Sequence, residues 1–275
     1  MAVLKPLSMN DLTGGKSFFL IAGPCVLESE AHALKMAKAI KKIAAKHRLP
    51  YIFKTSFDKA NRSSHTSFRG VGMKKGLEIL AKIRKEAGVW VTTDVHESAD
   101  VAEVAKVADI IQIPAFLCRQ TDLLVAAAKT GKIVNVKKGQ VLSPWDAKNI
   151  VEKLKNAGGK KIMLTERGAS FGYNNLVVDM RAFPVMQRFG VPVVYDATHS
   201  LQLPGAHAGG TATGGMREYI PTLAKAAVAA GIDGLFMEVH DAPEKALSDS
   251  TTQFPLSKLD TLLKSLVSIQ KAARS

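Results

Sequence analysis

The strongest constraint on the fold is a repeated alternation of short apolar runs with longer helical windows. Several of the runs are apolar at nearly every position, which is typical of parallel strands that are covered on both faces. Eight such pairs, each an expected strand followed by an expected helix, are Phe18–Ala22 and Glu30–His47, Tyr51–Thr55 and Met73–Glu86, Val89–Asp94 and Ala99–Lys106, Ile110–Ile113 and Gln120–Lys129, Ile133–Val136 and Pro144–Asn156, Ile162–Thr165 and Asp179–Arg188, Val193–Asp196 and Gly215–Ala230, and Gly234–Glu238 and Leu256–Ala273.

Eight units in 275 residues predict a (β/α)8 TIM barrel, with residues 1–275 as a single domain. A doubly wound open sheet is the competing fold, but it normally carries a G-x-G-x-x-G turn after its first strand. The turn here reads Gly23-Pro24-Cys25. We expect the residues before Phe18 to form a short extension that caps the barrel bottom. The glycine-rich stretch Pro204–Gly215 follows the seventh strand and is expected to be a surface loop or a mobile lid.

The chain is basic, with 38 Lys and Arg against 24 Asp and Glu and a formal net charge of +14. Such an excess could indicate a nucleic-acid binder. Aromatic residues make up only 6%, however, which leaves few platforms for base stacking. We therefore expect no nucleic-acid partner and a positive cleft for small anions. Many lysines have the spacing of a solvated helix face: Lys35, Lys38, Lys41, Lys42, Lys46, Lys74, Lys75, Lys82 and Lys85.

The apolar runs are shorter than the roughly 20 residues that a membrane span requires. Residues 1–17 lack the apolar core and cleavage pattern of a secretory signal. Two cysteines, Cys25 and Cys118, cannot form a disulfide framework. We expect a cytoplasmic protein that has no membrane partner, with Cys118 acting as a small buried hydrophobic residue.

In a barrel of this kind, the C-terminal strand ends and the loops after them build the active site. Several of these ends carry a cation, and together such cations would form a funnel for anionic groups. The expected ligands are phosphorylated or carboxylated metabolites. One or two of the cations are expected to pair instead with Asp58, Asp94 or Glu166. The funnel cations are Lys54, Lys59, Arg62, Lys137 and Arg167.

A second constellation consists of Cys25, His199, Glu238 and Asp249. Their spacing in sequence is too long for a local metal motif. Because the eighth strand of a barrel closes against the first, strands seven, eight and one would bring the four residues to one sector of the rim. A thiolate, an imidazole and two carboxylates suit a zinc-like or iron-like divalent ion. The alternative for Cys25 is a small buried hydrophobic residue.

The strand-end segments resemble the 3-deoxy-D-manno-octulosonate 8-phosphate synthase family, also called the 2-dehydro-3-deoxyphosphooctonate aldolases. The matching segments extend from Ile21 to Ser250 and include every barrel unit. They are IAGPCVLESE, FKTSFDKANRSS, TDVHES, IIQIPAFLCRQTDLL, NVKKGQ, LTERGASFGYNNLVVDMR, YDATHSLQLPG and EVHDAPEKALSDS.

The resemblance implies condensation of phosphoenolpyruvate with D-arabinose 5-phosphate and water, to give 3-deoxy-D-manno-octulosonate 8-phosphate and inorganic phosphate for the lipopolysaccharide inner core. It implies a phosphoenolpyruvate site of Lys54, Lys59, Gln112, Lys137 and Arg167. It implies an arabinose 5-phosphate site of Asn61, Arg62, Ser63 and Arg119, with Asp94 positioning that substrate. Arg119 would reach a neighbouring subunit, in a homo-oligomer expected to be a tetramer. The residues expected to be catalytic are Lys54, Lys59, Asp94, His199 and Asp249.

The related synthase of aromatic biosynthesis, which uses erythrose 4-phosphate, is the alternative. It carries a KPRTS-like motif where this chain reads Lys59-Ala60-Asn61-Arg62-Ser63, so Asn61 is the expected discriminator. The resemblance also favours the metal-dependent branch of the family, because the metal-free branch has asparagine in place of Cys25. One divalent ion of zinc, iron or manganese type is therefore implied. It could activate a water molecule or only position the substrate, and His199 and Asp249 could also relay protons.

Overall fold

The computed structural model describes residues 4–15, 17–62, 64–207 and 212–274. Eight parallel strands close into a barrel, because the last strand of the series pairs back with the first. The closed (β/α)8 barrel predicted from the sequence is therefore confirmed. In order around the barrel the strands are β1 (Phe19–Gly23), β2 (Tyr51–Lys54), β3 (Trp90–Asp94), β4 (Ile110–Ile113), β5 (Ile133–Lys137), β6 (Ile162–Glu166), β9 (Val193–Asp196) and β12 (Gly234–His240).

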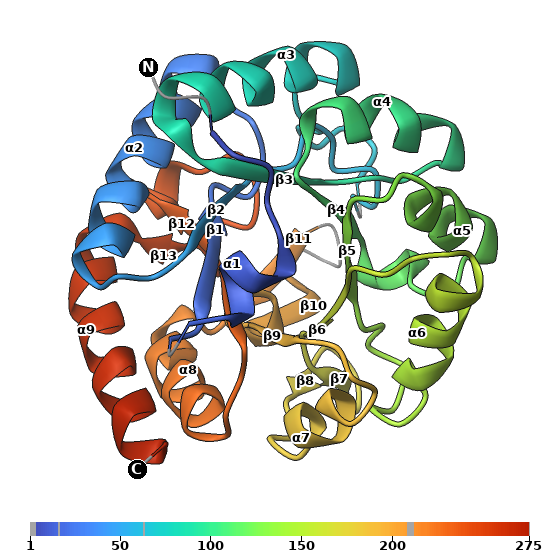
Figure 1. The fold of residues 1–275 in the computed structure, drawn as a ribbon. Coiled ribbons are helices and arrows are strands. Elements are labelled where there is room, and N and C mark those ends of the chain that lie inside the picture. Colours follow the sequence, from blue (N-terminus) through green and yellow to red (C-terminus); the bar gives the residue numbers. More distant parts are fainter. Residues whose placement is uncertain (1–3, 16, 63, 208–211, 275) are drawn as a thin grey trace.

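Helices between the strands form an outer ring around the barrel (Figure 1). Their apolar faces pack on the outer face of the sheet in one large hydrophobic cluster. A π-helical turn, Arg84–Gly88, directly follows the second helix of the ring. The ring consists of α2 (Glu30–Lys46), α3 (Met73–Ile83), α4 (Val101–Val107), α5 (Thr121–Lys129), α6 (Ala147–Asn156), α7 (Ala182–Gln187), α8 (Ile220–Ala229) and α9 (Leu256–Ala273).

Three helices begin at least three residues later than the sequence predicted. Helix α6 starts at Ala147 rather than at residue 144, because the Ser143 hydroxyl accepts the Asp146 N–H at 3.3 Å and holds a turn there. Helix α7 starts at Ala182 rather than at residue 179, since the Asp179 carboxylate accepts the Arg181 N–H at 2.9 Å. Helix α8 starts at Ile220 rather than at residue 215, because residues 212–215 form a strand instead.

The glycine-rich stretch after β9 contains two strands that the sequence did not indicate. Strand β10 (Gln202–His207) pairs antiparallel with β11 (Ala212–Gly215), and the ladder ends at Gly215. Residues 208–211, part of the expected loop or lid, lie outside the described residues. Short strands also occur as the antiparallel pair β7 (Ala169–Ser170) and β8 (Leu176–Val177) and as β13 (Phe254–Pro255), which extends β12.

The N-terminal extension includes helix α1 (Met9–Thr13), which lies over the centre of the barrel in Figure 1. Its Leu12 is fully buried in a cluster with barrel residues such as Phe19, Ile52 and Met163. Burial of one leucine side chain contributes roughly 1.5–3 kcal/mol. These contacts are compatible with the predicted cap.

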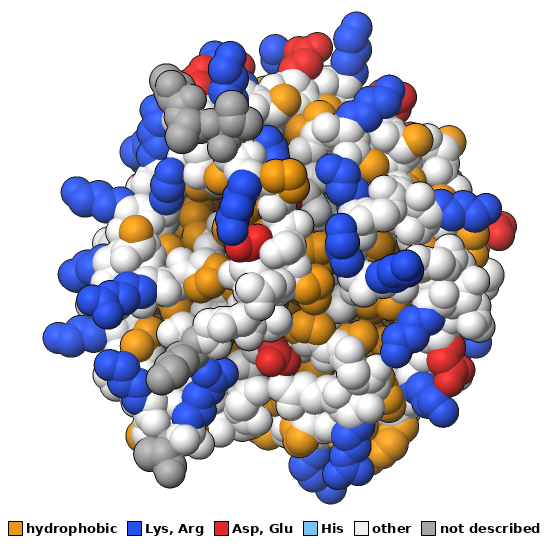
Figure 2. All heavy atoms as spheres, viewed as in Figure 1, with side chains coloured by type: hydrophobic (Ala, Val, Ile, Leu, Met, Phe, Trp, Pro, Cys, Tyr) orange, Lys and Arg blue, Asp and Glu red, His pale blue; other side chains and the backbone are white. Residues whose placement is uncertain are grey.

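The lysines assigned to solvated helix faces are all exposed, from Lys35 on α2 to Lys85 after α3. In the view of Figure 2, Lys and Arg side chains are spread over the surface rather than gathered in one patch. No helix in the described parts of the chain has both the length and the apolar character needed to cross a membrane.

Candidate active site

A cavity of about 410 Å³ opens at the C-terminal ends of the barrel strands. Its walls contain most of the side chains that the sequence analysis selected. It is the arrangement expected when strand ends from a closed barrel meet at one mouth. The selected residues that line it are Lys54, Lys59, Asn61, Arg62, Asp94, Lys137, Arg167, His199 and Asp249.

Two lysines stand side by side in the floor of this cavity. Lys54, at the end of β2, is only 1% exposed and donates to Ser56 Oγ at 2.9 Å. Lys137, at the end of β5, donates to Asp196 Oδ2 at 2.7 Å. The Phe236 ring lies beneath both, with its centroid 3.8 Å from Lys137 Nζ and 5.5 Å from Lys54 Nζ. A ring face stabilises desolvated cations, so Phe236 helps to hold the two charges together.

Burial lowers the pKa of two cations in the cavity, Lys137 and Arg167. Burial lowers the pKa of Lys137, and the nearby Lys54 adds to this, while Asp196 opposes it. Burial also lowers the pKa of Arg167, whose Nη2 donates to His199 O at 3.2 Å and to Gln202 Oε1 at 2.5 Å. Two desolvated cations are stabilised electrostatically when an anion binds beside them.

Asp94, at the end of β3, is the carboxylate of the floor. Burial acts to raise its pKa, but Lys54, Lys59 and Lys137 hold it well below its usual value, so it stays ionised. It accepts hydrogen bonds from Ser56 Oγ and Gln112 Nε2. Gln112 is fully buried and does not line the cavity, although it contacts Asp94, which does.

The structure brings Cys25, His199, Glu238 and Asp249 to one corner of the mouth. Ligand atoms of Cys25, Glu238 and Asp249 all lie within 4.8 Å of one another. His199 Nε2 is 3.3 Å from Glu238 Oε1 and 3.5 Å from Asp249 Oδ2. The adjacency of β9, β12 and β1, which pair in that order, places them together.

The surroundings of the fully buried Glu238 carboxylate indicate whether this corner can bind a cation. Neither of its oxygens has a hydrogen-bond partner among the described residues. Burial acts to raise its pKa, but His199, Lys59 and Lys54 hold it well below its usual value. A buried, ionised carboxylate without hydrogen bonds is costly, and a divalent ion with sulfur, nitrogen and oxygen ligands would satisfy it. The donor set therefore fits the implied metal.

The local backbone shapes this corner. Gly23 ends β1 where a Cβ atom would stand 2.1 Å from the Lys54 carbonyl oxygen, so only glycine allows the approach that leads into Cys25. Asp249 has a left-handed backbone with φ of 47°, which is strained for a residue other than glycine. Its carbonyl accepts the N–H groups of Thr252 and Gln253, both at 3.0 Å, which holds the strained turn.

Other selected residues have different positions. Arg119 is exposed and borders a separate hollow with Lys153 and Asn149, so this chain does not bring it to its own mouth. Ser63 lies outside the described residues. Cys118 is buried in the hydrophobic cluster, as predicted.

Of the three carboxylates expected to pair with funnel cations, Asp94 does so. Lys54 Nζ lies 3.5 Å from Asp94 Oδ2. The other two carboxylates pair outside the funnel set, Asp58 with Arg69 and Glu166 with Lys138.

Sequence reasoning assigned no role to several residues that organise the site. Asp196 is fully buried and accepts from His199 Nδ1 at 2.7 Å, which leaves Nε2 facing Glu238. Gln202 donates to Asp249 Oδ2 at 2.8 Å and so links Arg167 to the metal corner. The signal for Asp196 was its position at a strand end, three residues before His199. Phe236 had no signal beyond its place in an apolar strand.

Comparison with known proteins adds an independent finding. The family model described as the DAHP synthetase I family matches residues 7–275. A protein named 2-dehydro-3-deoxyphosphooctonate aldolase from Trichlorobacter lovleyi is 57% identical, with 95% of both chains covered. A protein of the same name from Koribacter versatilis is 56% identical, and the match covers 98% of both chains. Another from Desulfotalea psychrophila is 57% identical over 99% of this chain and 97% of the relative. The chain belongs to the DAHP synthetase I family.

Proposed function

We propose that this protein condenses phosphoenolpyruvate with D-arabinose 5-phosphate and water, releasing inorganic phosphate and forming 3-deoxy-D-manno-octulosonate 8-phosphate. The observation that carries the proposal is one mouth in which Lys54, Lys137 and Arg167 face Asp94 and the Cys25 corner. The names of relatives that match nearly the whole chain support this reaction over the one with erythrose 4-phosphate.

Phosphoenolpyruvate carries a phosphate and a carboxylate, and the buried cations match both. Arg167 can bind one anionic group through its planar fork, while Lys54 and Lys137 act as point charges. Their charge offsets the repulsion between the two anionic substrates and orients C3 of phosphoenolpyruvate toward the aldehyde carbon. Lys59, on the wall of the cavity, has a pKa well above its usual value: burial opposes its charge, but the negative charges of Glu238 and Asp249 outweigh that effect. It therefore contributes a stable positive charge.

The reaction forms one C–C bond and one C–O bond, and it breaks one C–O bond. C3 attacks the aldehyde, and its oxygen takes up a proton. Water adds at C2, and phosphate then leaves from C2 with its bridging oxygen. Cys25, His199, Glu238 and Asp249 would hold a divalent ion of zinc, iron or manganese type, which would supply a Lewis acid beside the aldehyde and the water. Asp196 fixes the His199 ring so that Nε2 faces this position.

Phosphate release tests the proposal directly. The metal-loaded protein should release phosphate from phosphoenolpyruvate with arabinose 5-phosphate and not with erythrose 4-phosphate. Chelation should abolish release, and a divalent ion should restore it. Full activity of metal-stripped protein would remove the metal from the proposal, and turnover with erythrose 4-phosphate alone would support the alternative reaction.

The variant Cys25→Asn sharpens the metal proposal. An asparagine amide fills the space of the thiol without binding a zinc-like ion strongly. We expect this variant to keep some turnover that is insensitive to chelator, whereas the wild type loses its activity. The measurement is phosphate release with and without chelator, alongside the metal content of both proteins.

Asn61 is proposed to select the aldose. Asn61→Ala should raise the KM for arabinose 5-phosphate about tenfold or more while leaving the KM for phosphoenolpyruvate within about twofold. Asn10→Ala, an exposed residue of α1 at the opposite end of the barrel, is the matched control. Equal effects on both KM values would contradict a role in aldose selection.

We also propose a cytoplasmic homo-oligomer, a tetramer, in which Arg119 completes the sugar phosphate site of a neighbouring chain. Its exposure and its place beside a hollow other than its own mouth support this assignment. Mixing Arg119→Ala with a variant inactivated at Arg167 should change the activity per active site if sites are shared. Light scattering gives the mass, and a monomer with full activity would overturn the assignment.

A further inference from the structure

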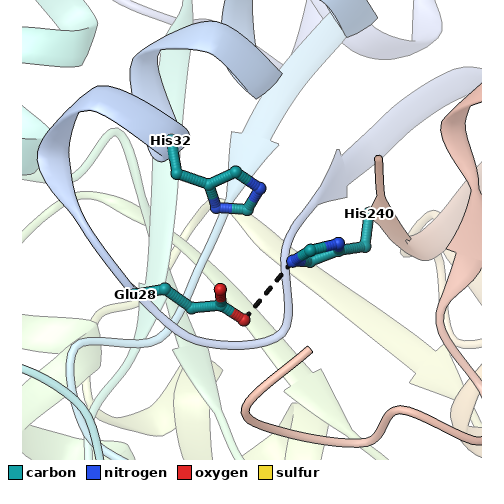
Figure 3. Close-up of side chains that lie close together, drawn as sticks. All are labelled: Glu28, His32 and His240. Carbon is teal, nitrogen blue, oxygen red and sulfur yellow. Dashed lines mark ion pairs between the residues drawn. The ribbon is translucent and has the colours of Figure 1, made fainter. Parts of the chain in front are cut away.

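A second cluster of metal-binding side chains lies near the same end of the barrel, outside the cavity lining. Glu28 precedes helix α2, His32 lies in the first turn of that helix, and His240 ends strand β12. One ligand atom from each lies within 4.8 Å of the other two. Figure 3 shows the three side chains pointing toward one another.

Two imidazole nitrogens of this cluster are buried without a hydrogen-bond partner among the described residues. His32 Nδ1 and His240 Nε2 have no hydrogen bond to any described residue. His240 is 4% exposed, and its Nε2 lies 3.4 Å from Glu28 Oε1. Buried nitrogens are normally satisfied, so two that face one carboxylate are suited to bind a cation.

The opposite nitrogens of both rings contact a single carboxylate. Asp241 Oδ1 lies 3.0 Å from His32 Nε2 and 3.2 Å from His240 Nδ1. Metal-binding histidines commonly donate their other N–H to such a carboxylate, which turns the free lone pairs toward the ion.

A metal-free arrangement competes with this one. The Ala242 N–H approaches His240 Nδ1 at 2.9 Å, which favours a proton on Nε2 directed at Glu28. A bound ion would shift this proton from Nε2 to Nδ1, which would donate it to Asp241 and give up the contact with the Ala242 N–H.

We propose that Glu28, His32 and His240 form a second divalent-metal site, separate from the Cys25 corner. Two imidazoles and one carboxylate suit a zinc-like ion and leave a position for water. Glu28 and His32 are partly exposed, which gives the ion a route from solvent.

An ion at this site would connect segments that are distant in sequence. It would join the start of α2 to the end of β12. Glu28 Oε1 also accepts the Leu247 N–H at 3.0 Å, and the loop containing Leu247 carries Asp249. Occupancy would therefore steady the loop that supplies one ligand of the Cys25 corner.

Metal counting on the full-length protein tests the proposal. Stripped protein is titrated with Co²⁺ and Zn²⁺, and the bound metal is measured after dialysis. Wild type should bind one more ion per chain than His32→Gln. The absorption band of Co²⁺ bound to thiolate reports the Cys25 corner and should be the same in both. His47→Gln, at the C-terminal end of the same helix, is the matched control.

Asp241→Asn provides a second variant that keeps all three ligands. It should weaken the affinity of this ion about 10- to 100-fold, because it removes the contact that orients both rings. Circular dichroism checks that each variant is folded. Equal metal counts and affinities for wild type and His32→Gln would overturn the proposal. A thiolate band lost while the extra ion remains would count against the Cys25 corner alone.

Discussion

The two ends of the barrel differ in the side chains that they bury, which are apolar at one end and charged at the other. At the N-terminal end, Leu12 of α1 packs with Phe19, Ile52 and Met163 in a cluster of apolar side chains. At the C-terminal end, Lys54 and Glu238 are equally inaccessible to solvent, at 1% and 0%, yet they are charged. Burial of apolar surface stabilises a fold, whereas burial of incompletely paired charge costs free energy.

The difference indicates where the protein stores binding capacity. The apolar cluster contributes stability, and none of its described members has an ionisable side chain. The charged end has two carboxylate oxygens of Glu238 without hydrogen bonds and a Lys137 whose pKa is lowered by burial. Such groups gain stabilisation when an ion or an anionic substrate arrives, so this end can bind tightly at some cost to the stability of the free protein.

The largest expected effect is a loss of activity at the charged end. Glu238→Gln keeps the shape of the side chain but removes its charge, so it should lower kcat/KM about 10²- to 10³-fold. The free energy of unfolding of the metal-free protein should also fall, by about 1–3 kcal/mol, because Glu238 Oε1 lies 3.6 Å from both Lys54 Nζ and Lys59 Nζ and these buried cations lose that partner. Phosphate release and urea unfolding measure the two quantities. A large loss of stability with retained activity would reverse the comparison.

The apolar end should respond in the opposite way. Leu12→Ala removes a fully buried side chain and should lower the free energy of unfolding by about 2–5 kcal/mol. The kcat of the folded fraction should stay within about twofold of wild type. Urea unfolding followed by fluorescence gives the stability, and Leu247→Ala, a half-exposed leucine, serves as the control for stability. An equal loss in both variants would show that α1 contributes no special packing.

The smallest expected effect concerns the cap of α1. The Ser8 side chain accepts the Asp11 N–H at 3.2 Å, and Asp11 accepts the Ser8 N–H at 2.9 Å. Hydrogen bonds from Lys5 and Ser8 lower the pKa of Asp11 from 3.8 to about 2. Asp11→Asn should therefore cost about 0.5–1 kcal/mol at neutral pH.

The pH dependence of this cost follows from the lowered pKa. The stabilisation by Asp11 is fully present above the unfolded value of 3.8 and is lost as the pH falls through about 2. The difference in unfolding free energy between wild type and Asp11→Asn should thus shrink below about pH 4. Denaturant unfolding at several pH values measures it, and a difference that grows toward acid would contradict the assignment.

Much of the candidate site could be predicted because strand ends carry a positional meaning. Lys54, Asp94, Lys137 and Arg167 each stand at or just after the end of an apolar run, and barrel closure brings such ends to one mouth. Glu238 and Cys25 met by the same logic, since β12 pairs with β1. The family resemblance added roles that residue type alone does not carry.

Other features could not be read from the chain. Asp196 and Gln202 have polar side chains among many, and their contacts to His199, Arg167 and Asp249 depend on positions in space. The late starts of α6 and α7 depend on side chains that capture backbone N–H groups, and a hydrophobic pattern does not register this competition. The β10–β11 ladder arose in a stretch whose glycines favoured a loop.

Local order along the chain therefore determined the eight-fold alternation, the barrel and the ring of polar strand ends, because periodicity and burial are encoded within short windows. Only the tertiary structure decided which charges pair, which stay unpaired, and that Glu28, His32 and His240 meet. Those outcomes depend on angstrom-scale distances between segments far apart in sequence, and electrostatic energies in a desolvated interior change steeply over such distances.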